Sequence, residues 1–452
     1  MERRRAAVKD FQKRKGYEAM DLSSAKIRVN RWLIVMFLGL TWGFSYEPPY
    51  IRYTYHEQLT SIVGYTDTQL GLMLSVYGTA ALIFYVIGGV SADKFSCRSL
   101  IVVSLLGTAV GCVIMAAYPP FWVALAVEAL WVVTTIALLW SPVAKVAALL
   151  GTQQEQGKIL PMVSSFEGVG AFLATLTSTL VFSRMGAENN PDSLRAVWIV
   201  YAIWGVVLAI TSYLFIPART LHENELGLKP EKEEKKAPQK GVLLSVLKNP
   251  MTYIASFIVM GSYIVYSCLT YTQSYLVDIY AMDMTTASYF SIIRNQVMKI
   301  AAGPLSVVFM STAILKSSPT RLCVVAGALS AVGLVITLLM PANPAVLPFL
   351  MVLAVVLSFF ALLGKAQNFA CTGETGVDPK FFGTMTGVVS LIGYSSDTWI
   401  YTVIGRWQET LEPVAAYHRI WYLAIFGCAL MAFSGIALLV RIKAQGKKAA
   451  AA

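Results

Sequence analysis

Ionisable side chains that interrupt long apolar stretches are the residues of this sequence whose types and positions allow chemistry. A charged group in the hydrocarbon core of a bilayer costs about 2.5–3.5 kcal/mol on insertion scales, so each of these residues is a functional hypothesis. The chemistry they offer is solute binding, proton transfer and ion pairing. No nucleophile with a base and an orienting group is apparent, so no catalytic residue is expected. The residues are Glu47, Arg52, Glu128, Lys145, Glu167, Arg294, Lys299, Lys365 and Asp397.

Two arginines, Arg52 and Arg294, predict a binding site for an anion. Arg52 follows Pro48 and Pro49, and such a pair kinks a helix and frees backbone carbonyls, which suits a helix that lines a cavity. The planar guanidinium of Arg294 fits carboxylate, phosphate or sulfonate. The alternative for Arg52 is that its head extends to the outer membrane interface. The predicted substrate-binding residues are Arg52, Arg294, Tyr46, Tyr50, Tyr263 and Tyr394.

Acids within the apolar stretches predict proton transfer or charge pairing. A carboxyl group near the membrane midplane requires either a nearby cation or a proton. For Glu167, the alternative to carrying a proton is a static bridge to Arg52 or Lys145. The predicted proton-coupling or charge-pair residues are Glu47, Glu128, Glu167, Asp397 and Lys299.

The second half of the chain adds its own charge-pairing candidates. Asp397 ends a stripe of small and polar residues along its helix, and it either pairs with Arg294 or Lys299 or takes up a proton. For Lys299, a pair with an acid of the second half is one alternative, which the sequence leaves open. Lys145 and Lys365 hold matching positions near the inner ends of the fourth and tenth apolar stretches, so we expect them to serve an inner gate.

The elements that position these residues must lie in lipid. Of the 452 residues, 56% are hydrophobic and 13% are charged, whereas soluble domains have about 25% charged residues. The net charge of +11 would suit nucleic acid, but the basic residues lie in short segments between apolar runs, so membrane orientation explains them better and no nucleic-acid partner is expected. Neither the six cysteines nor the three histidines show paired or metal-binding spacing, so we expect no disulfide framework, metal or cofactor.

A spanning helix needs about 20 mostly apolar residues, and the sequence contains twelve such runs in two sets of six. The predicted helices are near 32–54, 70–91, 99–117, 121–147, 158–182, 196–216, 250–274, 286–311, 321–340, 346–369, 382–403 and 418–440. The sequence therefore predicts an all-α membrane protein with two pseudo-symmetric six-helix bundles. The predicted domains are a cytoplasmic basic segment (1–31), an N-terminal bundle (32–217), a charged cytoplasmic linker (218–249), a C-terminal bundle (250–441) and a cytoplasmic tail (442–452).

The distribution of basic residues predicts the orientation of the chain. Most of the 36 Lys and Arg residues fall in the loops that lie on the same side as the N-terminus, and loops rich in these residues stay in the cytoplasm. Both termini are therefore expected in the cytoplasm. An even number of spans separates the halves, which makes them parallel repeats.

The segment Gly88-Gly-Val-Ser-Ala-Asp-Lys-Phe-Ser-Cys-Arg98 resembles the loop between helices 2 and 3 of the major facilitator superfamily. In this loop glycines let two helices approach closely, and an aspartate beside basic residues can latch a closed state. The equivalent place in the second half, 303–316, lacks the aspartate. The alternative is a basic loop that serves orientation alone. The predicted gating-loop residues are Gly88, Gly89, Asp93, Lys94 and Arg98.

Longer segments are similar to the YihN-type bacterial inner-membrane porters, near the nitrate/nitrite and organophosphate antiporters. These segments are 50–53, 66–78, 155–158, 167–168 and 383–397. Arg52 resembles the helix-1 arginine that glycerol-3-phosphate-type antiporters use against substrate phosphate. Their partner arginine lies on helix 7, which has none here, and Arg294 on helix 8 is the candidate in the second half.

Together these features predict a secondary active transporter in a bacterial inner membrane. It would move a small anionic organic solute by alternating access, coupled to protons or a counter-anion, as a monomer in the lipid bilayer. Two alternatives stay open, a proton-coupled exporter of drugs or metabolites and a membrane sensor that binds solute without moving it. An enzyme is not expected, and the lack of a Gly-rich phosphate loop with lysine excludes ATP as the expected energy source.

Overall fold

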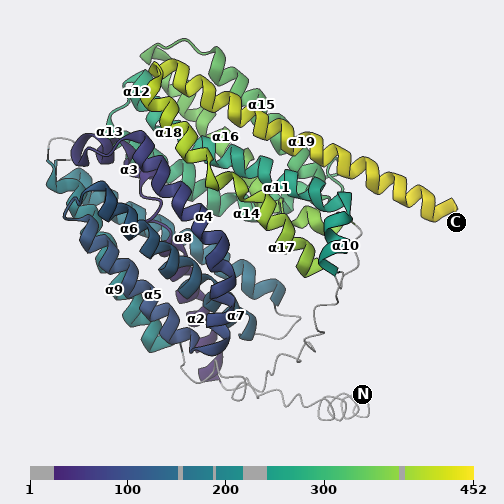
Figure 1. The fold of residues 1–452 in the computed structure, drawn as a ribbon, viewed down its shortest axis with the longest axis horizontal. Helices are drawn as coiled ribbons and strands as arrows, with labels where there is room; N and C mark the ends of the chain where they lie inside the picture. The colour runs from purple at the N-terminus through teal and green to yellow at the C-terminus, as the bar shows by residue number, and fades with distance from the viewer. Residues whose placement is uncertain (1–24, 151–155, 187–189, 217–241, 376–381, 452) are drawn as a thin grey trace.

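The computed structural model describes residues 25–150, 156–186, 190–216, 242–375 and 382–451, which form helices and turns and no β-strand (Figure 1). The prediction of an all-α protein is confirmed. The elements of the first half are α2 (Ala25–Ser45), α3 (Arg52–Gln58), η1 (Leu59–Val63), α4 (Asp67–Lys94), α5 (Cys97–Met115), α6 (Phe121–Val132), η2 (Val133–Trp140), α7 (Ser141–Leu149), α8 (Gln156–Arg184) and α9 (Asp192–Phe215).

The second half repeats this order of passes. Its elements are α10 (Val242–Lys248), α11 (Pro250–Leu269), α12 (Thr272–Tyr280), α13 (Met284–Ser291), η4 (Ile292–Val297), α14 (Met298–Met310), α15 (Pro319–Leu339), η5 (Pro344–Val346), α16 (Leu347–Gln367), η6 (Ala370–Thr375), α17 (Phe382–Gly393), η8 (Ser395–Thr398), α18 (Ile400–Thr410) and α19 (Pro413–Ala451). Grouping consecutive elements gives six passes in each half of the described chain, as the apolar runs predicted.

Three passes are broken, and the sequence predicted a kink only in the first of them. The first pass is interrupted between α2 and α3, where Pro48 and Pro49 remove backbone donors. The seventh is interrupted between α11 and α12, where the hydroxyls of Thr270 and Thr272 donate back to the carbonyls of Ser267 and Leu269, a bond that bends helices. The eleventh changes to the short 3-10 segment η8. Each break lies near a residue singled out for chemistry.

The ends of the predicted domains differ in detail from the structure. The segment 242–249 of the predicted linker carries the short helix α10, and Asn249 caps the helix that follows. The predicted tail, 442–452, begins as a continuation of α19. Most of the predicted segment 1–31 and of the linker lies outside the described residues.

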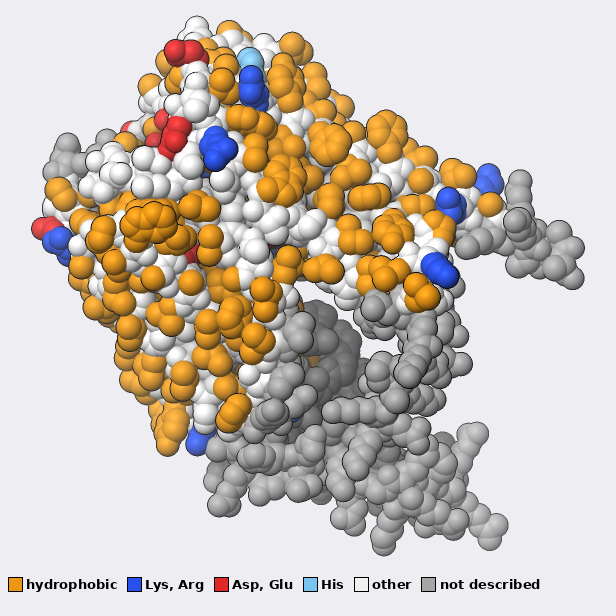
Figure 2. Space-filling view, viewed as in Figure 1, with side chains coloured by type: hydrophobic (Ala, Val, Ile, Leu, Met, Phe, Trp, Pro, Cys, Tyr) orange, Lys and Arg blue, Asp and Glu red, His pale blue; other side chains and the backbone are white. Residues whose placement is uncertain are grey.

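The outer faces of both bundles are apolar. Eight helices of the described chain are long and apolar enough to cross a bilayer, and Figure 2 shows hydrophobic side chains over the visible sides of both bundles, with charged side chains gathered toward the ends. Exposed residues on these faces include Ile83, Val103, Ile203, Val308, Val352 and Phe433. Such surfaces require lipid rather than water.

The two halves touch at one end and diverge toward the other (Figures 1 and 2). The contacts between halves join α3, α4 and α8 to α12, α13, η4, α14, η8 and α18. We call the end with α3, α12 and α13 the closed end, and the end with α7, α10 and the last residues of α19 the divergent end. The space between the halves is called the central cleft.

Candidate functional site

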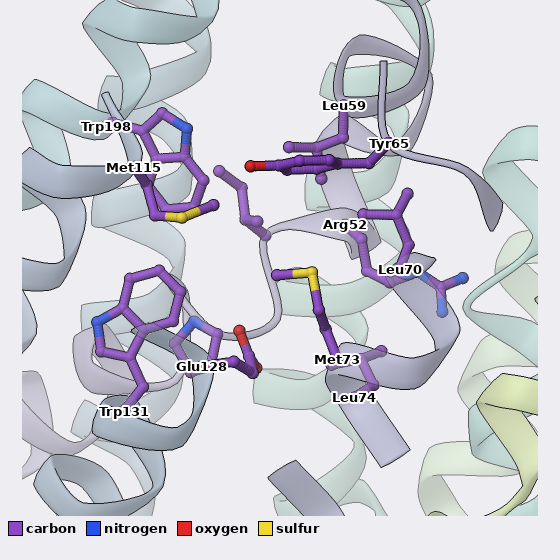
Figure 3. A pocket seen from close by; sticks show the side chains of 12 residues that line it. Arg52, Leu59, Tyr65, Leu70, Met73, Leu74, Met115, Glu128, Trp131 and Trp198 are labelled. Carbon is purple, nitrogen blue, oxygen red and sulfur yellow. The ribbon is translucent and has the colours of Figure 1, made fainter. Parts of the chain in front are cut away.

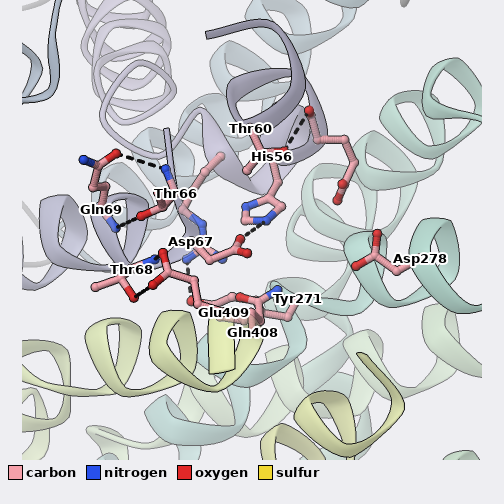
Figure 4. Close-up of polar contacts among 12 residues, drawn as sticks. His56, Thr60, Thr66, Asp67, Thr68, Gln69, Tyr271, Asp278, Gln408 and Glu409 are labelled. Atoms are coloured by element: carbon pink, nitrogen blue, oxygen red, sulfur yellow. Dashed lines mark hydrogen bonds and ion pairs between the residues drawn. The ribbon is translucent and has the colours of Figure 1, made fainter. Parts of the chain in front are cut away.

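Hydrogen bonds join the two halves at the closed end. The Glu409 carboxylate, at the end of α18, accepts from the backbone N–H of Thr68 at 2.9 Å and from its hydroxyl at 2.6 Å (Figure 4). An acid of the second half thus binds the N-terminus of α4 in the first, where a helix favours negative charge. Gln273 in α12 donates to the carbonyl oxygen of Thr54 in α3 at 2.7 Å. These bonds close the passage between the halves.

Glycines bring α4 and α18 into backbone contact at the same end. A methyl group at Gly71 would overlap the carbonyl oxygen of Tyr401, and one at Gly405 would overlap that of Asp67. Gly78, two turns from Gly71 on the same face, packs against η8. Because any larger side chain would hold the helices apart, these glycines set how tightly the closed end can shut.

Arg52 lies at this interface and is 5% exposed. Its Nη1 donates to the hydroxyl of Tyr271 at 2.7 Å, and its guanidinium carbon lies 4.0 Å from the centre of that ring. The ring centres of Tyr53 and Tyr401 are 6.0 and 5.8 Å away. Aromatic rings of both halves therefore hold the guanidinium, and the alternative that it reaches the membrane interface is wrong.

Arg294 is 2% exposed and lies in η4, a π-helical segment. Its Nη1 donates to the carbonyl oxygen of Leu269 at 2.6 Å, whereas Nε and Nη2 are buried without a hydrogen-bond partner among the described residues. Leu269 ends α11 and Tyr271 precedes α12, so Arg52 and Arg294 approach the same helix break from different halves. Unbonded buried donors require an acceptor.

The four tyrosines predicted to bind substrate belong to two aromatic clusters beside the central cleft. The rings of Tyr46 and Tyr50 in the first half are 6.3 Å apart, and those of Tyr263 and Tyr394 in the second half are 4.8 Å apart. Tyr53 extends the first cluster, with its ring centre 5.1 Å from that of Tyr50. The ring of Tyr266 lies 5.8 Å from that of Tyr263 and 6.5 Å from that of Tyr53, so it links the two clusters. The structure thus brings the two predicted pairs to either side of one interface.

Glu47 connects the halves through uncharged partners. The hydroxyl of Thr175 in α8 donates to its carboxyl group at 2.5 Å, and the amide of Gln296 in η4 donates to it at 2.9 Å. Gln296 is two residues from Arg294, so the same π-helical segment presents a cation and an amide to the interface. This position is typical of π-bulges at functional sites.

Glu167 and Lys299 form an ion pair of 2.6 Å across the central cleft. The lysine side chain is 42% exposed although it lies in the middle of a pass, so the pair faces open space between the halves. The alternatives weighed for Glu167, a bridge to Arg52 or Lys145, are wrong. The alternative that Lys299 pairs with an acid of the second half is wrong as well, because Glu167 belongs to the first half. Helix register alone cannot show which helices face each other across the two bundles.

Removing this ion pair is expected to weaken the contact between the halves by about 0.5–1 kcal/mol, because a partly exposed pair is screened by water. The coupling energy follows from a double-mutant cycle of Lys299→Ala and Glu167→Ala, measured by thermal unfolding of the purified protein in detergent. The exposed pair Arg195 and Asp192, within α9, serves as the control with coupling near zero. Coupling no larger at Lys299 and Glu167 than in this control would contradict the prediction.

Asp397 does not pair with Arg294 or Lys299, which corrects two further alternatives. Asp397 is 8% exposed, and its Oδ1 has no hydrogen-bond partner among the described residues. Lys365 lies nearby and places its Nζ 3.3 Å from the ring centre of Tyr266 and 5.2 Å from that of Tyr263. Lys365 is therefore a cation of the aromatic cluster as well as a candidate for the inner gate.

Glu128 lies in a different place from the other acids. It is 1% exposed, and its Oε1 has no partner within the described part of the chain. Its carboxyl group lines a small apolar cavity inside the first bundle near the closed end, which has room for about one water molecule. Figure 3 shows the carboxyl group pointing into this space. Glu128 is therefore separate from the central cleft.

The predicted gating loop lies at the divergent end, where α4 ends and α5 begins. Gly88 packs against the carbonyls of η2, and Arg98 stacks on Tyr213, with its guanidinium carbon 4.5 Å from the ring centre. Lys145 donates to the carbonyl oxygen of Ala92 at 2.9 Å and so contacts the end of α4. The side chains of Asp93 and Lys94 and the surroundings of Gly89 lie outside what the structure describes.

Sequence reasoning missed the uncharged and closed-end partners. Tyr271, Gln296 and Gln273 were not singled out, although each is a polar residue inside a predicted span. His56, 2.8 Å from the Asp67 carboxylate (Figure 4), was considered only as one of three histidines without metal-binding spacing. A search for all polar residues in the spans, rather than for charges alone, would have found them.

Two bundles of six passes that meet at one end, with charged and aromatic side chains between them, are the architecture of a membrane transport protein. The model of the Major Facilitator Superfamily matches residues 31–396 of the chain. The chain belongs to this superfamily, and it is a multi-pass membrane transporter rather than an enzyme.

Two relatives of the chain are inner membrane proteins of Escherichia coli K12. The inner membrane protein YqcE is 32% identical over 413 residues, which cover 91% of this chain and 96% of the relative. The inner membrane protein YihN is 26% identical over 425 residues, which cover 92% and 97%. The predicted resemblance to YihN-type porters is confirmed.

Among solved structures, the nucleoside transporter NupG has a similar fold. It superposes with a TM-score of 0.68 over 93% of this chain and 99% of its own, at 14% sequence identity. Likeness at this identity shows the fold alone.

Proposed function

We propose that this chain is a secondary active transporter that carries a small organic anion across the inner membrane by alternating access. The observation that carries the proposal is Arg294, a buried guanidinium whose Nε and Nη2 lack acceptors among the described residues. A carboxylate, phosphate ester or sulfonate offers two oxygen atoms in the spacing that such a fork binds. The anion would supply both the missing acceptors and the missing countercharge.

Arg52 and Lys365 support the same solute class. Arg52 contacts the helix break that Arg294 also contacts, and Lys365 adds a cation on the aromatic rings of the second half. Arg52 and Arg294 are buried cations without an ion pair among the described residues, and an incoming anion stabilises such cations. The tyrosine hydroxyls beside the cleft would hydrogen-bond the uncharged part of a hydrophilic solute.

We infer that both termini are cytoplasmic and that the closed end faces the outside. The excess of Lys and Arg in segments at the divergent end supports this orientation. The structure would then be the inward-open state, in which a solute in the central cleft exchanges with the cytoplasm. Opening to the outside requires the loss of the hydrogen bonds that Thr68 donates to Glu409 and that Arg52 donates to Tyr271.

Coupling to protons would use Asp397. Its Oδ1 has no hydrogen-bond partner in the described part of the chain, whereas Glu167 already binds Lys299, so Asp397 is the better candidate of the two acids that sequence reasoning favoured. Intramembrane carboxyl groups of this kind act in proton relays. A counter-anion exchanged at the same cations is the alternative form of coupling.

Counterflow in proteoliposomes tests the solute class. Small carboxylates, phosphate esters and sulfonates are first screened for a rise in melting temperature, since a ligand that binds only the folded state stabilises it by mass action. At least one anion is expected to accumulate against its gradient when the same anion is trapped inside, while a nucleoside and a pentose serve as neutral controls. Accumulation of neutral solutes alone would overturn the anion assignment, and binding without counterflow would indicate a sensor.

A further inference from the structure

We propose that Glu128 is the alternative partner of Arg52, which binds Tyr271 when the closed end is shut and Glu128 when that end opens. The inference rests on the alternating access of the proposed function and not on the identity of the solute. Its basis is a cavity that both side chains share and that leaves each of them incompletely bonded.

Arg52 and Glu128 line the same small cavity of the first bundle (Figure 3). The stem of Arg52 borders this cavity, while its guanidinium points away toward Tyr271 of the second half. Arg52 is the cation among the lining residues, and Glu128 is the carboxylic acid among them. A change of side-chain rotamer would turn the guanidinium from the interface toward the acid, and the cavity, which now has room for about one water molecule, would widen to receive it as the closed end opens.

Opening the closed end removes the present partner of Arg52. The hydrogen bond and the close stacking both go to Tyr271, on the other half. The Nε of Arg52 has no hydrogen-bond partner among the described residues even in the closed form. A buried guanidinium that loses its partner is strongly destabilised unless another acceptor takes its place. Within the first half, Glu128 presents that acceptor on the wall of the cavity that Arg52 already lines.

Packing alone does not account for an acid at this position. The second half has a related cavity between α11, α12, α15, α16 and α19, which is lined by Leu276, Ala354, Leu357, Trp421 and other residues without a carboxyl group. Glu128 is the eighth residue of α6 and Ala354 is the eighth of α16. The corresponding position in the second half is therefore apolar, whereas Glu128 is buried with its Oε1 unbonded among the described residues, at a substantial desolvation cost.

The exchange would also change the charge that the solute meets. With the closed end shut, the Arg52 guanidinium lies at the helix break that Arg294 contacts. With the closed end open, the carboxylate of Glu128 would neutralise Arg52 inside the first bundle. The affinity for an anion would then differ between the two states, which is the differential binding that any coupling of solute to conformation needs.

Spin-label distances across the closed end test the exchange without any solute. Cysteines introduced at Ala117 and Ala345, exposed positions at this end of the two halves, are labelled, because the six native cysteines are buried. Pulsed electron paramagnetic resonance then gives the fraction of molecules with the closed end open. Glu128→Gln is expected to lower this fraction about tenfold in the native background and less than twofold in an Arg52→Gln background, since the acid acts through the arginine.

Met115→Leu, which changes the same cavity wall while conserving its volume, is the matched control and is expected to leave the distances unchanged. If Glu128→Gln does not fold, Glu128→Asp takes its place, and its smaller reduction should again require Arg52. An equal effect of Glu128→Gln in both backgrounds, or no effect in either, would overturn the exchange. Because no solute is present, such a result leaves the anion proposal to be decided separately by counterflow.

Discussion

Replacing Arg294 by glutamine is expected to reduce the apparent affinity for the transported anion about 10- to 100-fold. Hydrogen bonds to a charged group contribute roughly 1.5–3 kcal/mol, and each 1.4 kcal/mol changes a binding constant about tenfold. The side chain is buried, and Nε and Nη2 have no other acceptor in the described structure, so little of this energy can be recovered elsewhere. Counterflow in proteoliposomes, with the anion found by the melting-temperature screen, gives the half-saturation concentration.

Two further variants separate charge from geometry. Arg294→Lys keeps the positive charge but loses the planar fork, so it is expected to retain part of the affinity. Arg195→Gln, at an exposed arginine paired with Asp192, is the matched control and should change the half-saturation concentration less than twofold. If Arg294→Gln transports the anion like the unchanged protein, Arg294 does not bind the solute and the proposed site is wrong.

The fold could be predicted from the sequence because one physical requirement dominates it. In lipid, every backbone polar group must bond internally, so runs of apolar residues become helices, and the twelve runs correspond to the twelve passes. The breaks were harder to predict. Pro48 and Pro49 gave a clear signal for the first, but the break after Leu269 arises from Thr270 and Thr272, whose hydroxyl bonds occur in many unbroken helices as well.

The site could be predicted only in part, because residue type is visible in a sequence and the relation between helices is not. Insertion energetics singled out Glu167 and Lys299, which the structure brings together between the halves, and Arg294, whose role in binding solute stays a prediction. The partners of these residues could not be predicted, because the ion pair of Glu167 and Lys299 joins residues 132 positions apart in different bundles. Three-dimensional packing decides such pairs. Local spacing along one helix carries no information about them.

Adding one methyl group at Gly71 is expected to shift the protein away from the closed form by about 1–3 kcal/mol, a factor of roughly 5 to 150 in the equilibrium. The new Cβ would overlap the carbonyl oxygen of Tyr401 in the opposite half, and a backbone atom cannot turn aside as a side chain can. Gly71→Ala should therefore increase the fraction of molecules with the closed end open, measured by spin labels at Ala117 and Ala345. Gly405→Ala should act in the same direction, because its methyl group would overlap the carbonyl oxygen of Asp67 at the start of α4.

Two other glycines distinguish this effect from general destabilisation. Gly170→Ala places a methyl group against the carbonyl of Leu40 within the first bundle, so it should lower the melting temperature without opening the closed end. Gly303→Ala meets no atom within 4 Å and should change neither quantity. If Gly71→Ala lowers the melting temperature as Gly170→Ala does and leaves the spin-label distances unchanged, the glycine contact serves packing alone. A shift in distance without a comparable loss of stability would instead mean that two glycines on α4 and α18 set the balance between the open and closed forms, because their contact exists in only one of the two states.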